Sequence, residues 1–139
     1  MEAEHKFSPK GKAILVVDDE RRMVEFIRMN LELEGYRVST AFNGVEALQR
    51  VRNDLPDLVL LDVMMPELDG FQVCTRLKRD DETKGIPVVM LTARADAKDV
   101  TRAFSSGAAD YVVKPYDPLI LQQKVAANLR AGSGGKAGL

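Results

Sequence analysis

One apolar run limits the possible folds of this chain more than any other feature. Five of the six residues from Leu58 to Val63 are apolar, and they do not alternate with polar residues. Such a run is typical of a parallel strand that helices cover on both faces. The one exception is Asp62, which is followed by a turn segment that begins with Met64-Met65-Pro66. The sequence therefore predicts a buried strand that ends on a carboxylate, where open α/β sheets hold their functional groups.

Four other short runs predict strands, and a helical pattern follows each strand. Apolar residues recur at three- and four-residue spacing in these patterns, and the last two helices are expected at about 97–106 and 118–130. Asn43 and Asp117 are expected to cap helices, and Gly35 to end one. The alternation predicts an α/β fold, a doubly wound parallel sheet with helices on both faces. The expected strands are Ala13–Val17, Tyr36–Ala41, Leu58–Asp62, Ile86–Leu91 and Tyr111–Val113.

Composition is that of a single domain of ordinary size. The chain has 139 residues, of which 45% are apolar, enough for a core of its own. We expect a flexible leader at 1–11, one domain at 12–130 and a flexible Gly-rich tail at 131–139. No apolar stretch has the length of a membrane span, and the polar start differs from a signal peptide. A cytoplasmic protein is therefore expected.

The charge balance and the scarcity of His and Cys argue against several function classes. The 20 basic and 21 acidic residues give a net charge of −1, so we expect no direct binding to nucleic acid or to an anionic membrane. The single histidine, His5, has no neighbours suited to a zinc site or a Ser-His pair. Cys74, the only cysteine, falls on an apolar helix face, which favours a place in the core over a reactive role.

Polar side chains stand at the ends of four predicted strands. Asp18 and Asp19 follow the first strand and Asp62 ends the third. Thr92 follows the fourth strand and Lys114 the fifth. Alone, the paired aspartates and Thr92 fit helix caps or loops, and Lys114 fits surface charge. Because all strands of a parallel sheet point the same way, these ends gather on one edge, and their joint placement favours a single site.

Three carboxylates brought close together require a cation or a proton. At an effective dielectric near 20, each pair of negative charges about 5 Å apart costs roughly 3 kcal/mol. An all-oxygen ligand set suits a hard divalent ion, and Mg²⁺ is the natural choice. Lys114 and Thr92 would hold the oxygens of a phosphoryl group, while Asp62 would attack phosphorus to form an aspartyl phosphate. A cis peptide bond before Pro115 would fix the direction of the lysine.

Together, these motifs resemble the receiver domains of two-component response regulators over about residues 12–130. The resemblance implies one CheY-like, flavodoxin-like (βα)5 domain with strand order 2-1-3-4-5, an order that periodicity alone does not give. The motifs that carry it are Val16–Glu20, Leu60–Pro66 with Asp69-Gly70, Leu91–Ala93 and Asp110–Pro115.

The resemblance also implies roles at the acidic end of the site. Asp62 would be the phosphoacceptor for a sensor histidine kinase or a phosphotransfer protein, and the domain would catalyse only its own phosphorylation and dephosphorylation. Asp19, Asp62 and the backbone carbonyl of Met64 would bind Mg²⁺, with Asp18 acting mainly through water. Nothing in this chemistry makes the chain an enzyme for a separate substrate.

Further roles concern the response to phosphorylation. Lys114 and Thr92 would contact phosphoryl oxygens in the modified state only. Thr92 and Tyr111 would then reshape the surface formed by the fourth helix, fifth strand and fifth helix, where a downstream effector binds. Apolar residues at Val100 and 119–121 favour an apolar partner contact there, with the chain a monomer or a phosphorylation-dependent dimer.

Two alternative functions stay open at this point. A pseudo-receiver would use the same fold as a constitutive interaction module without phosphotransfer, although such modules usually lack one of the site residues. A Mg²⁺-dependent phosphohydrolase would need a second carboxylate two residues after Asp62, where the chain has Met64. The resemblance also implies that Met64 and Arg94 border the route of attacking water, which makes them candidates for setting the lifetime of the phosphoryl group.

Overall fold

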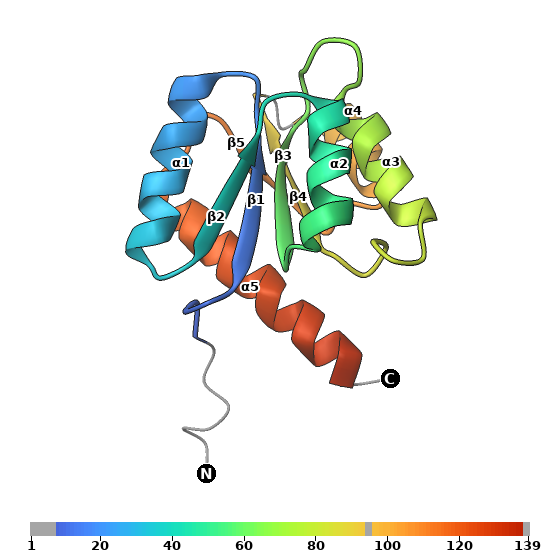
Figure 1. The fold of residues 1–139 in the computed structure, drawn as a ribbon. Coiled ribbons are helices and arrows are strands. Elements are labelled where there is room, and N and C mark those ends of the chain that lie inside the picture. Colours follow the sequence, from blue (N-terminus) through green and yellow to red (C-terminus); the bar gives the residue numbers. More distant parts are fainter. Residues whose placement is uncertain (1–7, 94–95, 138–139) are drawn as a thin grey trace.

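The fold is a five-stranded parallel sheet between two layers of helices (Figure 1). The structure is a computed structural model that describes residues 8–93 and 96–137. The strands lie in the order β2 (Arg37–Ala41), β1 (Ala13–Val17), β3 (Leu58–Asp62), β4 (Val88–Thr92) and β5 (Asp110–Val113), and all neighbouring pairs are parallel. The predicted fold class, a doubly wound sheet of order 2-1-3-4-5 in one domain, is confirmed.

Each strand is followed by one helix. The first half of the fold comprises β1 (Ala13–Val17), α1 (Arg21–Leu33), β2 (Arg37–Ala41), α2 (Gly44–Asp54) and β3 (Leu58–Asp62). The second half comprises α3 (Gly70–Arg79), β4 (Val88–Thr92), α4 (Ala97–Ser105), β5 (Asp110–Val113) and α5 (Pro118–Ala137). No helix in the described ranges has both the length and the apolar character needed to cross a membrane.

Strand residues alternate between two hydrophobic cores, one on each face of the sheet. In β3, Val59 and Leu61 pack toward α2, α3 and α4, whereas Leu58 and Leu60 pack toward α1 and α5. This alternation follows from the two-residue period of a strand and explains why β3 carries no polar residue before its end. Cys74 lies in the first core, as predicted, and burial raises the pKa of its thiol.

The predicted caps are present where the chain enters its helices. The Asn43 side chain accepts a hydrogen bond from the backbone N–H of Glu46 at 2.8 Å, and Asp117 accepts one from Leu119 at 2.8 Å. Asp69 and Gln72 form a reciprocal capping box that the sequence reading did not single out. This cap fixes the start of α3, the first element after Asp62.

Several boundaries differ from the predictions. The strand β4 begins at Val88 rather than Ile86, because Pro87 has no N–H to donate to a neighbouring strand. The helix α5 continues to Ala137, beyond the predicted end at about Arg130. The division into leader, domain and tail stays a prediction, and His5 and Arg94 lie outside the described residues.

Candidate functional site

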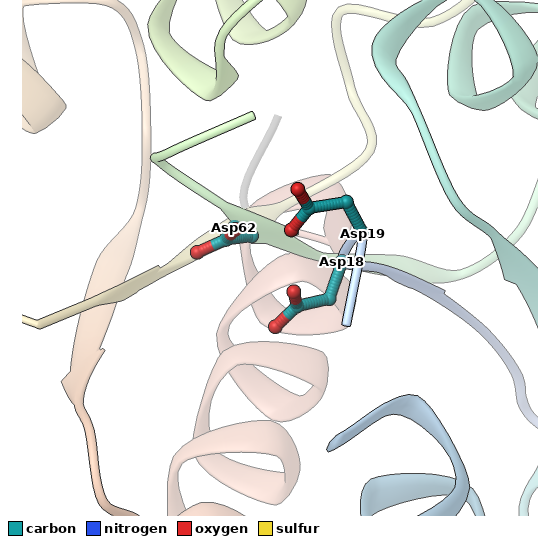
Figure 2. A group of neighbouring side chains, drawn as sticks. All are labelled: Asp18, Asp19 and Asp62. Carbon is teal, nitrogen blue, oxygen red and sulfur yellow. The ribbon is translucent and has the colours of Figure 1, made fainter. Parts of the chain in front are cut away.

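Three aspartates meet at the carboxyl ends of β1 and β3 (Figure 2). Asp18 and Asp19 directly follow β1, and Asp62 is the last residue of β3. One oxygen of each carboxylate lies within 4.8 Å of the others. Asp18 is fully buried and Asp62 is 3% exposed, whereas Asp19 faces solvent. We call Asp18, Asp19 and Asp62 the acidic cluster.

Strand register and side-chain alternation explain why these residues meet. Val17 pairs with Leu61 across the β1–β3 ladder, so Asp18 and Asp62 occupy the next level of the sheet. Both follow strand residues that pack toward α2, α3 and α4, and therefore both point toward the α1–α5 side. The sequence prediction that these strand ends gather on one edge is confirmed in the structure.

Lys114 reaches the acidic cluster from β5, two strands away from β3. Its Nζ donates hydrogen bonds to Asp62 Oδ1 at 2.9 Å and to Asp18 Oδ2 at 3.1 Å. The lysine backbone is anchored to β4 by a 2.7 Å hydrogen bond from its N–H to the carbonyl oxygen of Thr92. The Lys114–Pro115 peptide bond is cis, the conformation that the sequence reading considered.

The pKa values of Asp62 and Lys114 show that the site has more negative than positive charge. Burial raises the pKa of Asp62 to about 6, since the opposing hydrogen bond from Lys114 is offset by the charges of Asp18 and Asp19. Burial alone would lower the pKa of Lys114, but Asp62 and Asp18 outweigh it and hold that pKa above its usual value. One shared ammonium therefore serves two buried carboxylates, and Asp62 remains incompletely neutralised.

The backbone after Asp62 is shaped by a close approach between two segments. The N–H of Gly70 donates to the carbonyl oxygen of Val63 at 3.0 Å, and a Cβ on Gly70 would clash with the carbonyl oxygen of Asp62. Only glycine permits this contact, so Gly70 fixes the path of the segment that carries Met64. The Met64 side chain is 74% exposed, and within the described ranges no hydrogen bond is made to its carbonyl oxygen.

Thr92 and Tyr111 occupy different positions from the ion-paired group. Thr92 is buried at the end of β4, where alternation directs its side chain toward the α2–α4 face rather than the side that holds Asp62. Tyr111 lies on β5 between α4 and α5, with its ring edge-on to Phe104 at 6.1 Å and Lys124 Nζ at 5.5 Å from its centroid. Their switching roles stay predictions.

The acidic cluster fits a hard divalent cation. It offers only oxygen ligands, and its oxygens are close enough to share one ion. Repulsion between carboxylates at this spacing is about 3 kcal/mol per pair at an effective dielectric near 20, which a bound cation would relieve. Asp19 is exposed, so the acidic cluster extends to the protein surface. Mg²⁺ with retained waters suits this arrangement better than zinc, which favours His and thiolate ligands.

Tyr116 lies near the site but was not predicted from the sequence. Tyr116 is 8% exposed, and burial together with the charges of Asp18 and Asp62 holds the pKa of its hydroxyl well above the usual value. Its position two residues after Lys114 is a local signal that could have drawn attention to it. Leu121, which the sequence predicts to lie with Leu119 and Ile120 on the effector surface, is fully buried in the core beside α1.

The chain belongs to the family of response regulator receiver domains. The family matches residues 14–126, which span the sheet and nearly all the helices. Receiver domains are the signalling modules of two-component systems, and the fold and acidic cluster described above agree with this assignment.

Related proteins extend this assignment. The chain is 43% identical over 117 residues to the DNA-binding dual master transcriptional regulator RpaA of Synechocystis sp. and 44% identical over 117 residues to the phosphate regulon transcriptional regulatory protein PhoB of Rhizobium meliloti. Both matches cover 84% of this chain but only 48% and 52% of those proteins, so the chain spans about half the length of these curated relatives. The chemotaxis protein CheY4 of Vibrio cholerae has a similar structure, with a TM-score of 0.82 at 28% identity over 85% of this chain and 98% of that one.

Proposed function

We propose that this domain accepts a phosphoryl group on Asp62 from the phosphohistidine of a sensor histidine kinase or phosphotransfer protein. The observation that carries this proposal is the buried Asp62 carboxylate at 2.9 Å from the Lys114 ammonium, beside two further carboxylates at a strand end. Family membership supports the same reaction.

The chemistry requires one bond exchange. A carboxylate oxygen of Asp62 attacks phosphorus, the bond from phosphorus to the histidine nitrogen breaks, and the electron pair of that bond returns to the imidazole. Burial disfavours the charge on Asp62, which places its pKa at about 6 and leaves the carboxylate mostly ionised at neutral pH. The Asp62 carboxylate is therefore ionised and able to attack, and Lys114 neutralises its charge only in part.

The phosphoryl oxygens carry negative charge during this exchange, so positively charged groups must bind them. Mg²⁺ would be held by Asp19, Asp62 and the carbonyl oxygen of Met64, with Asp18 acting through water, and it would supply charge neutralisation for the transferred group. Lys114 then moves from its bond with Asp62 to a phosphoryl oxygen. The Thr92 side chain turns from the α2–α4 face and donates a hydrogen bond from its hydroxyl to another phosphoryl oxygen. The half-buried lysine is already held beside the acidic cluster by its ion pair with Asp18.

The proposed output is a change in the surface of α4, β5 and α5. Thr92 lies at the start of the connection to α4, and Tyr111 packs against Phe104 of α4, so both adjoin elements of that surface. Exposed apolar side chains at Phe104, Leu119 and Ile120 would meet a downstream effector domain or protein. A cytoplasmic location and a monomer or phosphorylation-dependent dimer accord with this role.

The direct test is the intact mass of the protein after incubation with acetyl phosphate and Mg²⁺. We expect a gain of about 80 Da, one phosphoryl unit, that requires Mg²⁺ and is absent from Asp62→Asn. Asp110→Asn is the matched control, because Asp110 also bonds a lysine at 2.9 Å but lies outside the acidic cluster. A modification that persists in Asp62→Asn would contradict the proposal.

If no mass gain is observed, a binding experiment with beryllofluoride, which mimics the phosphoryl group, distinguishes two explanations. Tight, Mg²⁺-dependent beryllofluoride binding would indicate an acceptor that loses its phosphoryl group quickly. No binding would favour the alternative, a pseudo-receiver that acts as a constitutive interaction module. The complete set of Asp18, Asp19, Asp62, Thr92 and Lys114 argues against that alternative.

A further inference from the structure

The Tyr116 hydroxyl is a buried polar group without a partner. Among the described residues it is the only buried side-chain nitrogen or oxygen for which no hydrogen bond is found. Leaving such a group unpaired costs about 1–3 kcal/mol, and phenylalanine would fill nearly the same space without that cost. The hydroxyl therefore calls for an explanation in terms of something it binds.

The position of Tyr116 directs attention to the acidic cluster. The residue lies between β5 and α5, and its ring packs in the core that α1 and α5 form with the sheet. This is the side toward which Asp18 and Asp62 point. Burial, together with the negative charges of Asp18, Asp62 and Glu20, raises the pKa of the hydroxyl and keeps it protonated. It is thus a neutral hydrogen-bonding group on the same side of the sheet as the acidic cluster and within reach of its charges.

The neighbouring carboxylates already have other partners. Asp18 Oδ1 accepts from the N–H of Glu20 at 3.0 Å, and Asp18 Oδ2 and Asp62 Oδ1 accept from Lys114. The hydroxyl bonds none of them, although their charges reach it. A bridging oxygen would satisfy it. Because Mg²⁺ retains several of its waters in protein sites, an ion at this cluster brings such oxygens with it.

We propose that Tyr116 is a positioning residue for the Mg²⁺ site, with its hydroxyl hydrogen-bonded to a water molecule that the bound ion carries. The inference rests on the proposed function, since it assumes that the acidic cluster holds Mg²⁺. The hydroxyl oxygen accepts a hydrogen bond from that water and fixes its orientation beside Asp18. Groups that orient the ligands of an ion in this way commonly change metal affinity by a factor of ten or more when they are removed.

Tyr116→Phe tests the proposal, with Mg²⁺ binding measured by calorimetry and stability measured by urea unfolding in EDTA. We expect the Mg²⁺ dissociation constant to rise about tenfold. Stability without metal should stay unchanged or increase, because the substitution removes an unpaired buried hydroxyl. The two opposite effects separate a role at the ion from a role in packing.

Tyr36→Phe is the matched control. Tyr36 is buried in the same core, but it lies near Glu34 and Arg130, at the start of β2 and away from the acidic cluster. It should leave Mg²⁺ affinity unchanged. An equal loss of affinity in both variants would overturn the proposal, as would a loss in Tyr116→Phe accompanied by a matching loss of stability in EDTA.

The measurement also distinguishes the two levels of inference. If the unmodified protein binds no Mg²⁺, the proposed function fails at its metal requirement, and the role of Tyr116 falls with it. If the unmodified protein and Tyr116→Phe bind Mg²⁺ equally well, the proposed function stands and the role of Tyr116 is wrong.

Discussion

Two lysine–aspartate pairs in this molecule share the same contact distance but differ in their electrostatics. Lys114 lies 2.9 Å from Asp62 at one edge of the sheet, and Lys124 lies 2.9 Å from Asp110 near the other edge. The pKa of Asp62 is raised to about 6, whereas the pKa of Asp110 is lowered. The same short contact is therefore compatible with opposite preferences for the charged carboxylate.

The difference comes from burial and from the number of partners. Burial opposes the charge of both carboxylates, but Asp110 is less buried and also accepts from the N–H of Tyr111 at 2.8 Å and from Asn128 at 3.1 Å. Asp62 is nearly inaccessible and shares its lysine with Asp18. The pair at Asp110 is a completed structural interaction. The pair at Asp62 is left short of positive charge, a condition that favours the binding of a cation.

Removal of the lysine should produce the largest contrast between the two pairs. Lys114→Met leaves two buried carboxylates without their cation, and we expect a loss of about 3–5 kcal/mol in the free energy of unfolding at neutral pH in EDTA. Lys124→Met should cost about 1 kcal/mol or less, because that pair is partly exposed and screened by solvent. Urea unfolding at pH 7 measures both.

Two conditions should reduce the cost of Lys114→Met. Low pH protonates the carboxylates, and added Mg²⁺ replaces the missing positive charge. Equal costs for the two lysine variants, or a cost of Lys114→Met that Mg²⁺ does not change, would show that the acidic cluster is not short of positive charge.

The pH dependence of stability should differ in sign between the two aspartates. The pKa of Asp62 is raised on folding, so its ionisation destabilises the domain as pH increases from about 4 to about 6. A shift of about two units corresponds to about 3 kcal/mol. Asp62→Asn should therefore gain stability relative to the unmodified protein across this window in EDTA, and the gain should level off near neutral pH.

Asp110→Asn should behave in the opposite way. The pKa of Asp110 is lowered on folding, so its contribution is present above the unfolded pKa near 3.9 and is lost as pH falls through the folded value. The variant should be less stable than the unmodified protein at pH 7, and the two should converge in acid. Unfolding free energies at a series of pH values check both variants. If the two variants showed the same pH dependence of stability, the proposed electrostatic difference between Asp62 and Asp110 would be wrong.

The sequence predicted one of these two regions and missed the other, for a physical reason. Asp18, Asp62 and Lys114 stand at strand ends, and the geometry of parallel strands brings such ends together whatever the details of packing. The contact of Lys124 with Asp110 depends on the rotation of α5 over β5, which no local pattern reveals. The Tyr116 hydroxyl and the contact of Gly70 with Asp62 likewise depend on close three-dimensional packing. The strand order itself came from the resemblance, since periodicity does not distinguish neighbours.

The smallest expected effect concerns Asn128, which completes the Asp110 pair from α5. Its side chain donates to Asp110 Oδ2 at 3.1 Å and to the carbonyl oxygen of Lys124 at 2.8 Å. Asn128→Ala should cost about 1 kcal/mol of stability through the lost hydrogen bonds and should raise the pKa of Asp110 toward its ordinary value. NMR titration of the Asp110 carboxyl and urea unfolding measure these changes. Mg²⁺ affinity and phosphorylation of Asp62 should not change, because Asn128 touches neither Asp62 nor Lys114. An altered Mg²⁺ affinity would show that the two regions are coupled through α5 and β5, and that their contrast is not a purely local property.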